Sequence, residues 1–257
     1  MNAPYSQPVV YFFGQGRADG TAAMKDVLGG KGAGLAEMTN LGIPVPPGFT
    51  IAASLCVTYL ETRQFPPWLR SQVETSLQRL EAAANRHFGG KERPLLVAVR
   101  SGAAVSMPGM METILNLGLN DTTVEGLRRE SNNAQFAWDS YRRFVAMYSL
   151  VVFDLPKAPF EHLLEERKKK AKVERDIDLP ADQMQALVQD FKAHVLKETG
   201  KPFPDDPIEQ LWGAIAAVFE SWNTRRAIDY RKLHDIPDTM GTAVNVVTMV
   251  FGNLGED

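Results

Sequence analysis

Leu28-Gly-Gly-Lys-Gly-Ala-Gly-Leu35 is a glycine-rich segment that runs directly into a predicted helix. The helix is predicted over Gly32–Leu41, because apolar residues recur at near-helical spacing and Gly42 follows as a stop. Glycines let a ligand approach the backbone closely, and the free amides of a first helical turn favour an anion. Lys31 adds a positive charge, so the segment is a candidate phosphate site. It lacks Walker A spacing, and a tight glycine turn with an exposed lysine is the structural alternative.

Short apolar runs of strand length and longer helical patterns occur on both sides of this segment, so we expect a chain that combines strands and helices, of the α+β class. Residues 1–119 mix strands, helices and glycine-rich loops, and Ile43–Gly48 is a stiff proline-rich linker. Residues 120–201 are helical, and Thr122–Glu125 is a possible capping box. Residues 202–257 begin again with a helix and a strand. The predicted strands are Val9–Phe13, Phe49–Ile51, Leu95–Arg100 and Thr242–Phe251, and the other predicted helices are Pro67–His87, Ala181–Thr199 and Ile208–Trp222.

A second candidate segment is the loop after the strand Leu95–Arg100. Arg100 is predicted to end that strand, where its guanidinium suits bidentate phosphate binding. The small, nearly uncharged loop Ser101–Met111 has Gly102 and Gly109 as pivots and is predicted to fold over a polyphosphate as a lid. The alternative is a plain surface loop with Arg100 in a structural salt bridge.

Composition excludes several classes of function. The 257 residues carry a net charge of −3, so no global basic field points to nucleic acid or to an anionic membrane. No signal peptide or membrane span is expected, and the single cysteine, Cys56, fits a reducing, cytoplasmic setting. The four histidines are not spaced as metal pairs, so no catalytic residue and no metal ligand is assigned in this chain.

The segments Val10–Gly14, Leu28–Met38 and Gly42–Phe49 together resemble the start of the dikinase family. That family includes pyruvate, phosphate dikinases, phosphoenolpyruvate synthase, rifampicin phosphotransferase and the glucan dikinases. The segments Ser106–Asn120 and Gly241–Gly252 are most similar to the pyruvate, phosphate dikinase branch. The resemblance covers essentially the whole chain.

The resemblance implies an incomplete ATP-grasp fold, with a mixed sheet lobe (1–119), a helical insert subdomain (120–201) and the truncated start of a second lobe (202–257). It implies conversion of ATP, phosphate and pyruvate into AMP, pyrophosphate and phosphoenolpyruvate through a phosphohistidine. Mg²⁺ is expected with ATP, and its ligands are expected beyond residue 257. The histidine, the pyruvate site and the homodimer contact are also expected there. The chain alone is therefore expected to bind ATP weakly or undetectably and not to turn over.

The resemblance also assigns roles to residues by motif position. Lys31 matches the family's phosphate-binding lysine, and Arg100 matches its ATP-contacting arginine. Met249 and Val250 match the strand that offers backbone groups to adenine. The sequence departs from the family at Ala104, where arginine is usual, and a charge is therefore missing from the lid. Glu112 replaces a common aspartate, and Val247 replaces a common glutamine. The expected ATP-binding residues are Lys31, Arg100, Ser101, Gly102, Gly109, Met111, Met249 and Val250.

The sequence also allows two other interpretations. One is a dikinase of the phosphoenolpyruvate synthase type, which uses water in place of phosphate. The other is a stand-alone module that binds nucleotide without chemistry.

Overall fold

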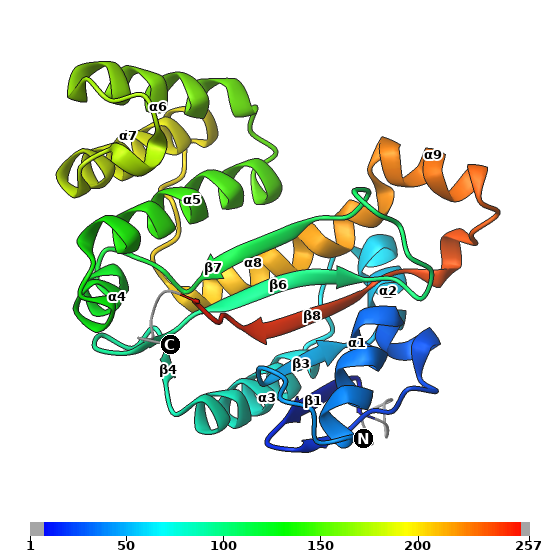
Figure 1. Ribbon diagram of the computed structural model, residues 1–257. Helices are drawn as coiled ribbons and strands as arrows, with labels where there is room; N and C mark the ends of the chain where they lie inside the picture. The colour runs from blue at the N-terminus through cyan, green and yellow to red at the C-terminus, as the bar shows by residue number, and fades with distance from the viewer. Residues whose placement is uncertain (1–7, 253–257) are drawn as a thin grey trace. The chain divides into compact units, whose positions relative to one another are not determined.

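The computed structural model describes residues 8–252, and these divide into two compact units that both contain helices and strands (Figure 1). Unit 1 consists of the residues up to Asn85, Ala98–Thr113 and Ile215–Thr248, and the rest forms unit 2. Each unit is therefore built from segments that are far apart in the sequence. The α+β class is confirmed, and no helix of residues 8–252 has the length and apolar character needed to cross a membrane.

Unit 1 is built on an antiparallel sheet whose middle strands come from distant parts of the chain. Strand β3 pairs with both β1 and β8, and β1 also pairs with β2. Strand β6 follows β8 in the sheet order, and at its far end the Ser101 N–H donates to the Glu112 carbonyl. In sheet order the strands are β2 (Arg17–Ala18), β1 (Val10–Gly14), β3 (Gly48–Ile51), β8 (Ala243–Thr248) and β6 (Val97–Gly102).

The strand register decides which helix covers which face of this sheet. Tyr11, Thr50 and Asn245 are neighbours across β1, β3 and β8, so their side chains share one face. Helix α1 (Lys25–Asn40) covers that face, and Tyr11 packs against its buried apolar residues Leu28, Ala33 and Ala36.

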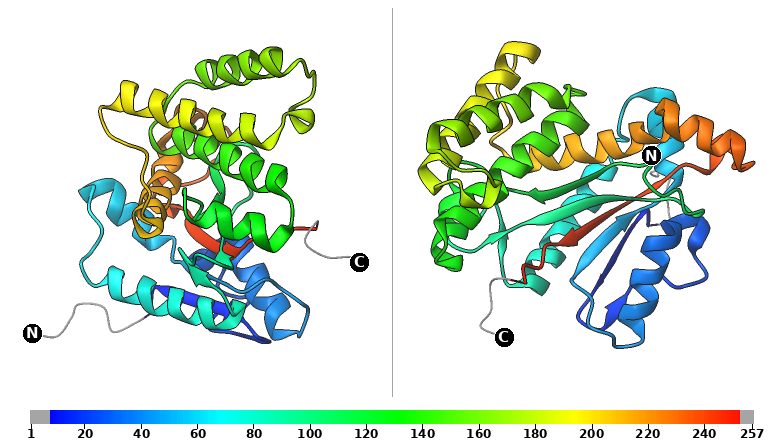
Figure 2. Two further views of the ribbon diagram at one scale, coloured as in Figure 1. Left: turned by 90° about the vertical axis from the view of Figure 1, so that its left-hand side faces the viewer. Right: turned by 45° about the horizontal axis from the view of Figure 1, so that its top comes forward.

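The opposite face carries the alternate residues, Phe12, Phe49 and Val246. Helix α3 (Leu69–Ala84) covers it, and the Arg79 guanidinium lies 4.2 Å from the centre of the Phe12 ring. Helices α1 and α3 thus lie on opposite sides of the same strands (Figure 2).

Aromatic contacts join the remaining helices of unit 1. Tyr59 of α2 stacks on Phe65 at 4.7 Å and approaches Phe219 of α8. These elements are α2 (Ser54–Thr62), the second half of α8 (Pro207–Glu220), α9 (Arg225–Leu233) and the short turns η2 (Ser221–Asn223) and η3 (Asp238–Met240).

Unit 2 is mainly helical, and its core lies between α5 and α7. Tyr141, Phe144 and Tyr148 of α5 recur at helical spacing and are all buried in this core. Helix α8 begins in this unit and β7 (Thr113–Leu117) continues into it. Its own elements are β4 (His87–Phe88), β5 (Pro94–Leu95), α4 (Thr123–Ser131), α5 (Ala134–Val152), α6 (Lys157–Ala171), η1 (Asp176–Asp178) and α7 (Ala181–Thr199).

Several local predictions are confirmed and others are wrong. Helix α7 has the predicted bounds and ends at Gly200, whose φ of 69° is left-handed. The predicted capping box at Thr122 is wrong. The Asn120 side chain accepts hydrogen bonds from the backbone N–H groups of Thr122 and Thr123, and the Thr123 hydroxyl accepts one from the Asn120 N–H. Asn120 therefore takes the Thr122 N–H, which the box would have paired with the Glu125 side chain.

The last predicted strand is shorter than expected, because β8 ends at Thr248 rather than Phe251. The three-part division of the chain remains a prediction. The two compact units are a different kind of division, based on contacts within the structure. Residues 1–7 and 253–257, which the prediction includes in its first and third parts, lie outside the described residues.

Candidate functional site

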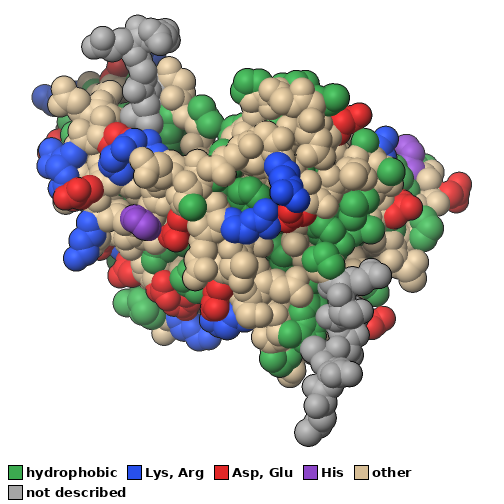
Figure 3. Space-filling model, turned by 90° about the horizontal axis from the view of Figure 1, so that it is seen from below, with side chains coloured by type: hydrophobic (Ala, Val, Ile, Leu, Met, Phe, Trp, Pro, Cys, Tyr) green, Lys and Arg blue, Asp and Glu red, His purple; other side chains and the backbone are tan. Residues whose placement is uncertain are grey.

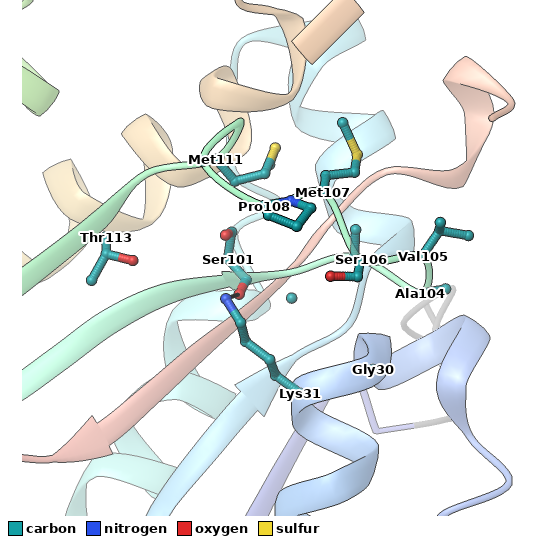
Figure 4. Close-up of a pocket in the computed structure, with 13 residues that line it drawn as sticks. Gly30, Lys31, Ser101, Ala104, Val105, Ser106, Met107, Pro108, Met111 and Thr113 are labelled. Atoms are coloured by element: carbon teal, nitrogen blue, oxygen red, sulfur yellow. Dashed lines mark hydrogen bonds between the residues drawn. The ribbon is translucent and has the colours of Figure 1, made fainter. Parts of the chain in front are cut away.

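A cavity of about 460 Å³ lies entirely within unit 1, beside Lys31 and the loop that follows β6 (Figure 4). Its lining combines a lysine, small residues, hydroxyl groups and methionines. The cavity brings together five predicted site residues, Lys31, Ser101, Gly102, Gly109 and Met111. The full lining is Gly30, Lys31, Ser101–Gly109, Met111 and Thr113.

A break in α1 forms one wall of this cavity. Gly29 has φ 67° and ψ 172°, a conformation that only glycine adopts without strain, so helical geometry restarts at Gly30. The Gly30 N–H donates to the Ala103 carbonyl at 2.9 Å. A Cβ atom at Gly29 would lie 1.5 Å from the Gly102 carbonyl oxygen. The glycines of this segment therefore serve close contact between the helix and the loop.

Lys31 lies in the first turn after the break and reaches across to the loop. Its ammonium donates to the Ser101 carbonyl oxygen at 2.9 Å (Figure 4). Burial of the ammonium lowers the pKa of Lys31 below its usual value, and the positive charge of Arg100 lowers this pKa further. A group whose charge is disfavoured in this way is stabilised by an incoming anion.

Arg100 is placed differently from the prediction. It lies inside β6, which continues to Gly102, and it is the one exposed residue of an otherwise buried strand. It does not line the cavity, although its charge acts on Lys31. The alternative of a structural salt bridge is not found, because no carboxylate among residues 8–252 pairs with Arg100 or with Lys31. Two neighbouring cations thus remain without a negative partner in the described part of the chain.

The positive charge at this place is local. On the face of the molecule shown in Figure 3, basic and acidic side chains are intermixed rather than separated into large fields. Attraction for an anion therefore depends on Lys31 and Arg100 themselves.

The loop is tied down at both ends and loosely held between them. At its start, the Gly102 N–H donates to the Thr242 hydroxyl at 3.1 Å. At its end, the Glu112 carboxylate pairs with Arg226, and the Glu112 N–H donates to the Ser221 hydroxyl at 3.5 Å. Val105, near the tip, is exposed. Anchored ends with an open tip fit the predicted lid.

Met249 and Val250 are not part of this cavity. Both follow β8 and belong to unit 2. The Met249 N–H already donates to the Leu96 carbonyl at 2.9 Å, so that group is not available to a ligand, and the Val250 side chain is 70% exposed.

The cavity does not offer a protein-bound metal site. No group of three or more His, Cys, Asp or Glu residues within positions 8–252 is arranged to hold a metal ion. The cavity lining contains no carboxylate, the ligand that Mg²⁺ prefers in proteins. Mg²⁺ does not fit these residues by themselves, and no step is assigned to it here.

Neither the residues that hold the two ends of the loop nor the buried polar pair in the sheet was identified from the sequence. Thr242 binds the start of the loop, and Ser221 and Arg226 hold its end. Asn245 and Thr50 form a buried pair across β8 and β3. Asn245 could have been identified from the sequence, because it is the one polar residue in the apolar run Ala243–Val247.

Comparisons with known proteins agree with the motifs. The chain matches the sequence profile of the family described as "Pyruvate phosphate dikinase, AMP/ATP-binding domain" over residues 25–86 and 59–255. It is 54% identical to a pyruvate, phosphate dikinase of Rhizobium meliloti (strain 1021) over 96% of this chain and 28% of the relative.

Two further relatives show the same pattern of coverage. Identity is 51% to a pyruvate, phosphate dikinase of Clostridium symbiosum, over 93% of this chain and 28% of the relative. It is 48% to the chloroplastic pyruvate, phosphate dikinase 1 of Oryza sativa subsp. japonica, over 98% of this chain and 27% of the relative. The chain thus spans slightly more than a quarter of the length of these relatives.

Proposed function

The chain belongs to the pyruvate phosphate dikinase AMP/ATP-binding domain family, and from this premise we propose that the cavity beside Lys31 holds the phosphate chain of ATP. The observation that supports the proposal most strongly is the pair of neighbouring cations, Lys31 and Arg100, that lack a carboxylate partner within residues 8–252. Each charge-assisted hydrogen bond to a phosphate contributes about 1.5–3 kcal/mol.

In this proposal the chain's own residues bind and enclose the triphosphate. The Lys31 ammonium exchanges the Ser101 carbonyl for a phosphate oxygen, and the positive end of the helical segment that restarts at Gly30 favours the same anion. Arg100 supplies the second charge. The loop Ser101–Met111 closes over the phosphates and excludes water, which strengthens these electrostatic interactions.

The proposal extends to the reaction that the relatives' names describe. The chain supplies the ATP-holding part of an enzyme that converts ATP, phosphate and pyruvate into AMP, pyrophosphate and phosphoenolpyruvate through a phosphohistidine. No catalytic residue or metal ligand is assigned here. An ATP-grasp fold, Mg²⁺ bound with ATP, a homodimeric assembly and a cytoplasmic location belong to the same proposal, and the family resemblance supports them.

The adenine end of the nucleotide is proposed to meet Met249 and Val250, as the family motif implies. Because the Met249 N–H already donates to the Leu96 carbonyl, the proposed adenine contact does not use that group.

The proposal is tested by calorimetric titration of the 257-residue chain with a non-hydrolysable ATP analogue. Weak binding is expected for the wild type, with a Kd on the order of 1 mM. The Lys31→Met variant should bind roughly tenfold more weakly or worse, because it loses one charge-assisted contact. Lys25→Met removes a positive charge from the same helix outside the cavity and is the matched control. Equal affinities of wild type and Lys31→Met would refute the proposed site.

AMP provides a second control, because it lacks the phosphates that Lys31 is proposed to hold. The loss caused by Lys31→Met should be larger for the ATP analogue than for AMP. An equal loss for both ligands would place the lysine elsewhere on the nucleotide.

A further inference from the structure

Asn245 carries an unpaired donor in the core of unit 1. It lies in β8 between Val244 and Val246 and is only 1% exposed. The hydroxyl of Thr50, its register partner on β3, donates to Asn245 Oδ1 at 2.9 Å. This bond directs the other edge of the amide, Nδ2, away from Thr50. Among residues 8–252, Asn245 Nδ2 has no hydrogen-bond partner, and a buried amide left unpaired is unfavourable.

The Thr50–Asn245 pair lies in close contact with two segments beside the cavity, one at Gly32 of α1 and one at Gly102. A Cβ atom at Gly32 would lie 2.9 Å from Thr50 Cγ2 and 3.0 Å from Asn245 Oδ1. A Cβ atom at Gly102 would lie 2.4 Å from Asn245 Nδ2. Helix α1 at Gly32 and the start of the loop at Gly102 therefore both lie in close contact with this pair.

These two glycines directly follow the residues that meet in the cavity. Gly32 follows Lys31 and Gly102 follows Ser101, and the Lys31 ammonium donates to the Ser101 carbonyl. The positions of Gly32 and Gly102 against this pair therefore set the position of Lys31 relative to the start of the loop. A larger residue at either glycine position would have to displace the pair.

We propose that Asn245 is a positioning residue for the phosphate site. Together with Thr50, it supports Gly32 and Gly102 at the separation that brings Lys31 over Ser101. Its unpaired N–H edge faces Gly102, which lines the cavity, and so directs the positive end of the amide dipole toward the place of the phosphates. The inference rests on the proposed function, because it concerns the same cavity.

The steric part of this role is tested by a double-mutant cycle in stability. Gly102 has no positive φ, and the only close neighbour of an added Cβ is the Asn245 amide nitrogen, since the next atoms lie 3.6 Å away. Gly102→Ala should therefore lower the melting temperature by roughly 3 °C or more in the wild type. In the Asn245→Ala background, where the amide is absent, the same change should have little effect.

Gly34→Ala is the matched control, because an added Cβ there meets no atom within 4 Å. An equal cost of Gly102→Ala in both backgrounds would overturn the contact between Asn245 and the start of the loop. This measurement needs no nucleotide and so does not depend on the proposed function.

The functional part is tested by titrating each variant with the non-hydrolysable ATP analogue and with AMP, at a temperature where all variants are folded. Asn245→Ala should weaken binding of the analogue roughly fivefold to tenfold and binding of AMP by less, so the ratio of the two affinities falls. A merely structural asparagine would lower the melting temperature and leave this ratio unchanged, and that result would overturn the inference alone. Equal binding of the analogue by the wild type and by Lys31→Met would overturn the proposed function and this inference with it.

Discussion

Replacing Gly29 by alanine tests whether the break in α1 is built for close contact with the loop. The backbone at Gly29 has φ 67° and ψ 172°, a region that costs other residues about 1–3 kcal/mol. The added Cβ would also lie 1.5 Å from the Gly102 carbonyl oxygen and 2.4 Å from its carbonyl carbon. These are backbone atoms, so the loop and the helix must separate to make room.

That separation breaks the hydrogen bond from the Gly30 N–H to the Ala103 carbonyl, which contributes about 1 kcal/mol. Strain and the lost bond together lower the free energy of unfolding by about 2–4 kcal/mol. For a chain of this size the melting temperature should fall by about 5–15 °C.

Circular dichroism melts and urea titrations of the Gly29→Ala chain measure this loss. Gly34→Ala, in the same helix, has free space for its Cβ and helical geometry, so it should raise stability by up to about 1 kcal/mol. The variants should therefore shift the melting temperature in opposite directions. A Gly29→Ala chain that melts with the wild type, or together with Gly34→Ala, would refute the close contact. Binding of the ATP analogue should also be lost in Gly29→Ala while the chain is still folded.

The remaining predictions concern charge at the two ends of the site. Binding takes up a proton at Lys31, so affinity for the ATP analogue should fall as pH rises through its lowered pKa, while binding by Lys31→Met should show no such step. Between that lowered pKa and the ordinary value of 10.5, the folded chain binds fewer protons at Lys31 than the unfolded chain. Lys31 should therefore make the free energy of unfolding rise with pH in this range. If the free energy of unfolding falls with pH in the wild type and this fall is absent in Lys31→Met, the lowered pKa is contradicted. Glu112→Gln removes the exposed pair with Arg226 and should cost less than about 1 kcal/mol of stability, while hydrogen exchange in the loop becomes faster; unchanged exchange would show that this pair does not anchor the lid.

Local signals in the sequence were sufficient for much of the fold. Helix α7 follows from its apolar spacing and from Gly200 as a stop, because both depend only on neighbouring residues. The aromatic residues of α5 are buried as their spacing predicts. The glycines around Lys31 pointed to a close backbone approach, and the structure places the Gly102 carbonyl at that position.

Long-range contacts account for what the sequence did not reveal. The hydrogen bond between Thr50 and Asn245 joins residues 195 positions apart, so no local pattern announces it. The position of Arg100 inside β6 depends on pairing that continues to Gly102. The hydrogen bond from the Met249 N–H to the Leu96 carbonyl, just after the end of β8, likewise joins residues far apart in the sequence.

Capping shows the same limit at short range. The pattern after Thr122 fits a capping box, yet the Asn120 side chain is the acceptor. Two candidate capping residues lie within a few positions of each other, and tertiary contacts decide which of them caps the helix. The Asn120 amide also donates to the Asp205 carbonyl, which holds it in place.

The most direct test of the account is an amide NMR titration of the chain with the non-hydrolysable ATP analogue. Convergence of the phosphates on the cavity predicts chemical-shift changes concentrated at residues 29–32 and 101–111, and predicts that Lys31→Met abolishes them at the same ligand concentration. Shift changes that are unaffected by Lys31→Met, or that leave both segments unchanged, would contradict it.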